Sequence, residues 1–351
     1  MIWRRIALAL FVSLGVVDLT ALARRGGPTW SVGDGAMIEL YTVHATNFVQ
    51  LLGAYSQYGW QHPGPMFFYL LAPFYVLGGH SVFGLDAGAL ALNVASVAIL
   101  AFVVARDGDR APVFAVVLCG LLLAYLLRLP GLLTSAWNPH PPVLALVALI
   151  AVCAACLCGR GPLLPLAAVL ASFVTQTHVG FVPVVAALGA VTVGGLLVAA
   201  GRAETSPSLG RWSLLSVAIL EALWLAPVAQ QLVGHPGNMT ELWRFFFGGG
   251  PTLWQSVLEV PLAVHWVHRW LAWVVLAVAT ALALSARRAG AVRVARPAAA
   301  LVAVVAVQIA LGVAVIVRHV PLSLALAHQA TGVAVFALAI VTIRRLASVA
   351  G

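Results

Sequence analysis

Long apolar stretches recur along almost the whole chain, and they constrain its fold more than any other feature. A helix needs roughly 17 to 25 residues to cross a bilayer, and only helices and closed barrels can satisfy their backbone groups there. We count about eleven apolar segments of near this length, approximately at 5–24, 64–79, 85–105, 112–128, 141–159, 162–178, 180–200, 212–232, 265–285, 298–318 and 323–343. The sequence therefore predicts an all-α, polytopic integral membrane protein.

The composition excludes a soluble fold. Hydrophobic residues make up 62% of the 351 positions and charged residues 8%, whereas a soluble domain is about half apolar and a quarter charged. The net charge of +9 would suggest nucleic acid in a soluble protein, but these arginines lie in short loops, where positive charge marks the cytoplasmic side of a membrane. We expect the lipid bilayer as a partner and no nucleic acid.

The basic residues also suggest where the protein resides. All nineteen are arginine, and the abundance of Ala, Val, Leu and Gly is typical of coding bias in a GC-rich bacterium. We therefore expect a multi-pass protein of the bacterial cytoplasmic (inner) membrane.

Arginine placement predicts the topology. Even numbers of spans separate the arginine-bearing segments that we assign to the cytoplasm, which are 160, 202–211, 287–296 and 344–345. The same assignment places on the outer side 129–140, the turn near 178–180, 233–264 and 319–322. Segments 25–63 and 129–140 are both assigned to the outer side, so an even number of spans must separate them. Three apolar segments lie between them, so one of the three should not cross the membrane.

Two histidines near the C-terminus lie at matching depth. His268 precedes Arg287 by 19 residues and His328 precedes Arg344 by 16, so at about 1.5 Å per residue their depths differ by only roughly 4 to 5 Å. Gln308 should reach a similar height on the antiparallel helix between them. A bis-histidine iron site would satisfy the imidazoles while burying an apolar macrocycle. The alternative is that His268 lies at the membrane interface and His328 hydrogen-bonds to a neighbour.

Residues 255–351 carry an ordered set of motifs: Val264-His265-Trp266-Val267-His268-Arg269, Arg287-Arg288, Gln308-Ile309-Ala310-Leu311-Gly312, Val320-Pro321 and Leu326-Ala327-His328-Gln329. In order, spacing and helix position, this set closely resembles the C-terminal half of the heme A synthase (COX15/CtaA) family. The resemblance implies that His268 and His328 ligate the iron of a b-type heme. It also implies an oxidoreductase role in heme A biosynthesis or cytochrome oxidase assembly.

The resemblance covers only half of that family's pattern. The other half holds the substrate heme and supplies a glutamate one helical turn before its histidine. Here the position one turn before His268 is His265, which we interpret as an interfacial structural residue. Whether one chain performs the complete oxidation stays open. A second chain that completes the helical bundle is one alternative, and an accidental fusion with neither activity intact is another.

Asp34 and Glu39 are the only carboxylates of the outer segment 25–63. A general base needs a positioned carboxylate near the acceptor hydroxyl, and a second acid can help to hold a metal. The alternative is that both acids are simply solvated. Four polar residues on the predicted outer side would line the same cavity, or would be separate interfacial groups: Asn138, His140, Gln176 and His178.

Residues 1–250 carry a second set of motifs: Trp60-Gln61-His62-Pro63-Gly64-Pro65 leading into Phe67-Phe68-Tyr69-Leu70-Leu71-Ala72-Pro73, then Trp137-Asn138-Pro139-His140, and Pro236-Gly237-Asn238-Met239-Thr240-Glu241-Leu242-Trp243. This region resembles glycosyltransferases of the GT-C type that use polyprenyl-phosphate sugars. The resemblance implies that Asp34 is the catalytic base or the acid that holds a divalent metal, and that Glu39 is its helper. It further implies that His62 contacts the donor phosphate, and that Asn138 and His140 bind substrate.

Two modules are thus predicted, a glycosyltransferase-like membrane module at 1–250 and a heme A synthase-like helical module at 255–351. The second module carries the more specific motif set. Heme binding is therefore the preferred function, and sugar transfer on the outer membrane face is the alternative.

Overall fold

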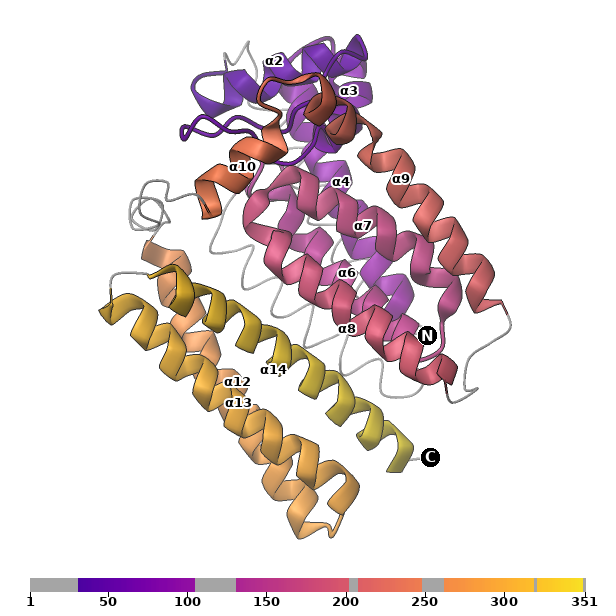
Figure 1. Ribbon diagram of the computed structural model, residues 1–351, viewed down its shortest axis with the longest axis vertical. Coiled ribbons are helices and arrows are strands. Elements are labelled where there is room, and N and C mark those ends of the chain that lie inside the picture. Colours follow the sequence, from indigo (N-terminus) through magenta and orange to yellow (C-terminus); the bar gives the residue numbers. More distant parts are fainter. Residues whose placement is uncertain (1–30, 105–130, 202–207, 248–261, 319–320, 350–351) are drawn as a thin grey trace. The chain divides into compact units, whose positions relative to one another are not determined.

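The computed structural model describes residues 31–104, 131–201, 208–247, 262–318 and 321–349 (Figure 1). Its helices are α2 (Asp34–Thr46), α3 (Met66–Leu77), α4 (Val82–Val104), α6 (Pro141–Leu157), η1 (Gly161–Leu163), α7 (Leu164–Thr177), η2 (Val179–Phe181), α8 (Val182–Gly201), α9 (Leu209–Val233), α10 (Asn238–Phe247), α12 (Leu262–Arg288), α13 (Val292–Val317) and α14 (Leu322–Val349). The described residues form no named strand, and an isolated bridge joins Tyr55 to Gln61. The predicted all-α class is confirmed for this part of the chain.

The chain divides into two compact units. The first unit comprises Met1–Val185 and Gly194–Trp243, and the second comprises Ala186–Val193 and Arg244–Gly351. The glycosyltransferase-like motifs lie in the first unit. The histidine pair lies in the second.

Five described helical segments are long and apolar enough to cross a membrane: Val82–Val103, Val179–Gly201, Leu209–Val233, Val292–Val317 and Ser323–Ile343. The expected total of about eleven is not reached among the described residues. Three of the expected segments form apolar helices shorter than 18 residues, namely Met66–Leu77, Pro141–Leu157 and Gly161–Thr177. The expected segments at 5–24 and 112–128 lie outside the described residues. The chain is a multi-pass membrane protein.

Helix α3 is too short to cross a bilayer. Its 12 residues extend about 18 Å, whereas the hydrocarbon core is about 30 Å thick. Pro65 is the N-cap of α3. After the helix the chain turns at Gly78 and Gly79, and Gly79 has φ +70°. Helix α3 is therefore shorter than a full span, and the third apolar segment of this region, 112–128, lies outside the described residues.

Arg160 joins the C-terminal ends of α4 and α6. It follows α6 closely, and its Nη1 donates to the backbone carbonyl of Val103 at 2.9 Å, near the end of α4. A cation suits this place because the last carbonyls of a helix carry partial negative charge. The contact places the ends of both helices at one level, and the cytoplasmic assignment of Arg160 stays a prediction.

Two segments predicted to lie on the outer side of the membrane contain short helices. Helix α2 lies within 25–63 and α10 within 233–264. Helix α2 buries Ile38, Thr42 and Ala45 along one side. Helix α10 is only 10 residues long, with Leu242 buried and Trp243 exposed. Helices this short are missed by a search for apolar runs long enough to cross a bilayer.

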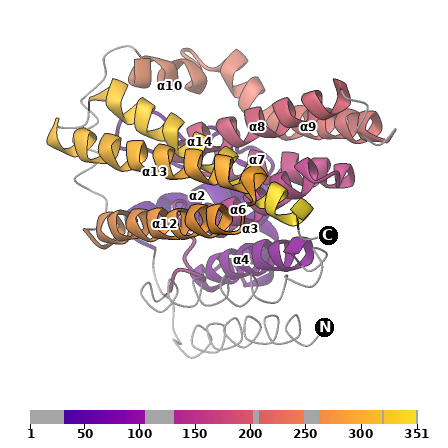
Figure 2. The same ribbon diagram turned by 90° about the horizontal axis from the view of Figure 1, so that it is seen from below.

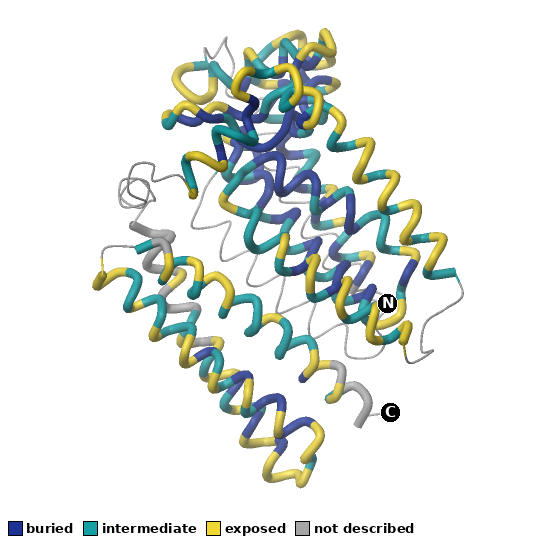
Figure 3. Tube along the Cα trace, in the orientation of Figure 1, coloured by how far each residue is buried: buried dark blue, intermediate teal, exposed yellow. Residues whose placement is uncertain are grey.

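The core of the first unit lies among α3, α4, α6 and α7. Each of these helices contacts the next one along the chain. Phe67, Phe68 and Leu149 are at most 1% exposed, and Figure 3 shows the buried residues gathered in these helices. Helix α9 is different, because its Leu214 and Leu225 are 74% and 66% exposed. Apolar side chains directed outward along a 25-residue helix are expected where the surroundings are lipid.

The second unit is built from α12, α13 and α14. Helix α13 packs against both of the others, and Figures 1 and 2 show the three long helices side by side. At their contact Ala279 of α12 meets Leu301 and Val305 of α13. Small residues let helix backbones approach closely where lipid supplies no hydrophobic driving force. Through α13, this packing fixes the positions of the first turns of α12 and α14 relative to each other.

Candidate functional site

His268 and His328 face each other in the second unit. Each lies six residues after the first residue of its helix, α12 and α14 respectively. Their ring centroids are 6.1 Å apart, and the ring planes meet at 80°. The depth match predicted from the sequence therefore becomes a direct contact between the two imidazoles.

Gln308 of α13 engages both nitrogens of the His328 ring. The backbone carbonyl of Gln308 lies 3.0 Å from Nδ1, and the side-chain Nε2 of Gln308 lies 3.3 Å from the ring Nε2. A carbonyl can only accept, so Nδ1 must carry the proton and donate it. In a neutral imidazole the ring Nε2 then has only a lone pair, which accepts from the Gln308 amide. The two contacts thus define one tautomer.

Two glycines make room for this contact. A Cβ at position 312 would lie 3.0 Å from Cε1 of His328, and a Cβ at position 332 would lie 3.3 Å from Nε2 of Gln308. Gly312 follows Gln308 by one helical turn, so its missing side chain leaves the Gln308 carbonyl open to the imidazole. Packing therefore explains the glycine of the Gln308-to-Gly312 motif, because a side chain there would crowd the His328 ring.

The donor set fits a heme iron. Two imidazoles whose ring centroids lie 6.1 Å apart would supply the two nitrogen ligands of a bis-histidine heme. A ligating histidine usually donates its second N–H to a carbonyl, as His328 does to Gln308. Apolar Ile309 and Val335 pack in the same three-helix cluster. His265 belongs to α12, and its interfacial role stays a prediction.

In the first unit, Asp34 is joined to the Trp137–His140 segment. The indole Nε1–H of Trp137 donates to Oδ2 of Asp34 at 3.0 Å, although 103 positions separate them. The Trp137 and His140 rings contact edge to face at 5.0 Å. Asp34 and Trp137 are exposed. Sequence reasoning named both motifs but missed this hydrogen bond, because nothing local in either motif points to the other.

Glu39 has a different partner from Asp34. Its Oε1 accepts from the hydroxyl of Tyr75 at 3.0 Å. Among the described residues, no group of three or more His, Cys, Asp or Glu side chains could hold a metal ion. The predicted divalent metal at Asp34 therefore has no support from this structure.

His62 and His178 form a contacting pair, with ring centroids 4.4 Å apart and ring planes tilted by 32°. Nδ1 of His62 accepts from the backbone N–H of Val179 at 3.0 Å, and Nδ1 of His178 accepts from Gly180 at 3.1 Å. Burial, with a smaller contribution from His178, lowers the pKa of His62 to about 3. Burial also lowers the pKa of His178 to about 4. Both rings are therefore neutral at pH 7.

Asn138 and Gln176 serve as buried connectors. Asn138 Nδ2 donates to the carbonyl of Thr177 at 3.2 Å. Gln176 Oε1 accepts from the N–H of Met66 at 3.3 Å, and its Nε2 donates to the carbonyl of Leu223 at 2.9 Å. Asn238 was quoted only as part of a motif, yet it pairs with both the N–H and the carbonyl of Gln61, at 2.8 and 2.9 Å. These contacts hold the predicted polar residues at one end of the first unit.

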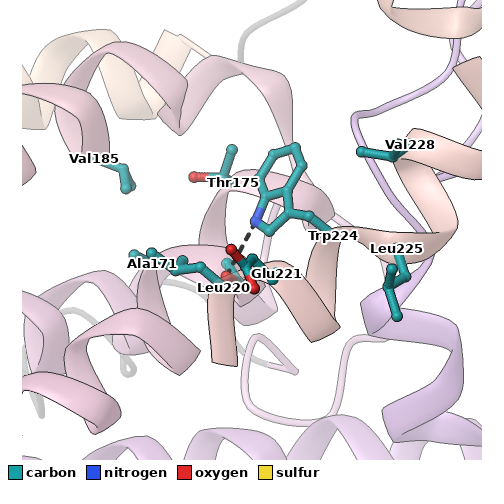
Figure 4. A pocket seen from close by; sticks show the side chains of 9 residues that line it. Ala171, Thr175, Val185, Leu220, Glu221, Trp224, Leu225 and Val228 are labelled. Carbon is teal, nitrogen blue, oxygen red and sulfur yellow. Dashed lines mark hydrogen bonds between the residues drawn. The ribbon is translucent and has the colours of Figure 1, made fainter. Parts of the chain in front are cut away.

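A groove of about 760 Å³ lies elsewhere in the first unit, along α7, the start of α8 and α9 (Figure 4). Glu221 lines it at the midpoint of α9. Beside it, the indole N–H of Trp224 donates to Ser172 Oγ at 3.2 Å. None of the predicted site residues lines this groove.

The helices and the histidine pair define a multi-pass α-helical membrane protein with a paired-imidazole site between its last three helices. Residues 113–340, well over half of the chain, match the COX15-CtaA family model, described as cytochrome oxidase assembly protein. The chain belongs to this family. The matched range begins far upstream of the predicted module boundary at 250–255, and the glycosyltransferase resemblance of residues 1–250 finds no support in it.

Several curated relatives are heme A synthases. The chain is 43% identical over 97 residues to that of Rhizorhabdus wittichii, covering 27% of each protein. It is 41% identical over 149 residues to that of Bradyrhizobium sp. (strain ORS 278), covering 39% of this chain and 40% of the relative. A third, from Rhodopseudomonas palustris (strain BisA53), is 40% identical over 93 residues, with 26% of each covered.

These matches are partial. The chain spans between 26% and 40% of the length of these relatives. No solved structure matches it significantly.

Proposed function

We propose that this chain is a membrane heme-binding protein of the heme A synthase type, acting in heme A biosynthesis or cytochrome oxidase assembly in a bacterial cytoplasmic membrane. His268 and His328 would ligate a b-type heme. The observation that carries the proposal is the 6.1 Å separation of these two rings in a chain of the COX15-CtaA family.

A bound heme would supply one-electron redox chemistry, with its potential set by axial ligands and burial. The chain's own residues perform the remaining tasks. Gln308 holds His328 in the tautomer that leaves Nε2 as the ligating atom. The packing of α13 against α12 and α14 fixes the distance between the two ligands.

A second chain that completes the bundle is the partner we propose for full heme A synthesis. The curated relatives extend well beyond the region that they share with this chain. In the three comparisons above, the match covers at most 40% of the relative. One helical turn before His268 stands His265, so that position offers no carboxylate for oxidation chemistry.

The test is a reduced-minus-oxidised absorption spectrum of the purified protein in detergent. We expect a b-type signal in the unmodified chain and its loss in His268→Ala and in His328→Ala. His80→Ala is the matched control, because His80 is an exposed histidine of the first unit that packs on Tyr75. A parent protein without any b-type signal after heme supply rules out the proposal.

A second candidate is transfer of a sugar from a polyprenyl-phosphate donor on the outer face. It is proposed because the hydrogen bond between Asp34 and Trp137 brings together two motifs of the glycosyltransferase resemblance. Asp34→Asn should abolish lipid-linked-sugar turnover while retaining the contact to Trp137, and Glu221→Gln should leave it unchanged. Equal turnover in Asp34→Asn and the parent would count against this candidate.

A further inference from the structure

Gln308 contacts His328 with both its backbone and its side chain. The carbonyl accepts a hydrogen bond from Nδ1–H at 3.0 Å, and the carboxamide Nε2 lies 3.3 Å from the other ring nitrogen. A ligand to iron needs a free lone pair. In this arrangement the only lone pair of the neutral ring is already held by an amide N–H.

The other end of the same carboxamide is poorly satisfied. Gln308 Oε1 is buried and has no hydrogen-bond partner among the described residues. An unpaired buried acceptor keeps its full desolvation cost. The hydrogen bond to His328 is therefore the polar contact that the structure gives this carboxamide.

We propose that Gln308 is a positioning residue with two separate tasks at the histidine pair, an inference that rests on the proposed heme function. Its backbone carbonyl fixes the His328 tautomer. Its side-chain amide occupies the ring Nε2 in the heme-free protein and must leave before that nitrogen can ligate iron. The amide thus covers the ligating atom and keeps it from protons and free divalent metals until heme arrives.

Titration of the heme-free protein with hemin tests the second task. Removing one neutral hydrogen bond that competes with ligation should tighten hemin binding by roughly two- to tenfold, so we expect this gain in Gln308→Leu. The position of the reduced absorption band should not move, because both imidazoles and the backbone carbonyl remain. Thr280→Val is the control, since Thr280 lies on α12 and bonds only to Leu276 of its own helix; its affinity should equal the parent's.

Gly312→Ala tests the first task. The new methyl group would lie 3.0 Å from Cε1 of His328 and 3.5 Å from its Nδ1, so the ring must move away from the carbonyl. We expect weaker hemin binding and a shifted midpoint potential. Gly194→Ala is the matched control, because a Cβ there meets nothing within 4 Å.

Equal or weaker hemin binding in Gln308→Leu, with helix content retained, overturns the proposal. If Gln308→Leu does not fold, Gln308→Ala carries the same expectation. A parent protein that binds no hemin overturns the proposed function and this inference together. A parent that binds hemin while Gln308→Leu gains nothing overturns this inference alone.

Discussion

His62 packs against His178 with ring centroids 4.4 Å apart, and its Nδ1 accepts a hydrogen bond from the backbone N–H of Val179, which is 117 positions away in the sequence. This contact ties the loop before α3 to the turn between α7 and α8. It places two neutral imidazoles, His62 buried and His178 partly buried, at one end of the first unit. The stability of that end should depend on pH.

Acidification from pH 7 to pH 5 should destabilise the protein. The pKa is about 3 for His62 and about 4 for His178 when folded, against about 6.5 when unfolded. Below pH 6.5 the unfolded chain binds protons that the folded chain does not, so the stabilisation is complete above pH 6.5 and is lost as pH falls toward the folded pKa values. His62 alone should account for about 2 kcal/mol between pH 7 and pH 5.

Thermal unfolding followed by circular dichroism at several pH values measures this dependence. In His62→Asn the amide oxygen can still accept from Val179, but the titrating group is gone, so we expect a flatter dependence on pH. The same slope in His62→Asn and the parent would contradict the assignment.

Gln176→Leu should destabilise the first unit strongly. The side chain is fully buried, and its loss leaves the N–H of Met66 and the carbonyl of Leu223 without their partner. Each unsatisfied group costs about 1–3 kcal/mol. Gln329→Leu, at an exposed position of α14, should change the unfolding temperature little. Equal effects in the two variants would show that the buried amide contributes nothing particular.

Gly53→Ala should be among the most damaging glycine substitutions. A Cβ there would collide with the backbone carbonyl of His62, and backbone cannot move aside as a flexible side chain can. We expect a loss of about 1–3 kcal/mol or more, measured by thermal unfolding in detergent. Gly35→Ala in α2 is the comparison, because its Cβ would meet only Ser31 at 3.8 Å. Alanine there should stabilise the helix by about 0.5–1 kcal/mol.

Gly332→Ala should strengthen hemin binding, although its methyl group would not touch either histidine closely. That methyl would lie 3.3 Å from Nε2 of Gln308, so it should displace the amide from the His328 ring. We expect an effect in the same direction as Gln308→Leu but smaller, by hemin titration. In the double variant Gln308→Leu with Gly332→Ala the amide is already absent, so the second substitution should add no further gain in hemin affinity. Additive gains would argue that Gly332→Ala does not act by displacing the amide.

Most helix positions were predictable from the sequence, because hydropathy is a local property. The expected segment at 212–232 corresponds to α9, and that at 298–318 to α13. The short helices α2 and α10 were not predicted, because their burial depends on neighbours elsewhere in the chain. The length of α3 was also not predictable from hydropathy. The helix ends before the turn at Gly78 and Gly79, so it is shorter than the apolar segment expected at 64–79.

The sequence by itself determined the membrane class and the matching depth of His268 and His328, because the rise of a helix per residue is constant. It did not determine how each helix is rotated about its axis or which helices touch. Only the tertiary structure decided that Gln308 meets both nitrogens of His328 and that Trp137 bonds to Asp34. The physical reason is that hydrogen bonds form between side chains brought together by packing, and packing depends on the surfaces of several helices at once.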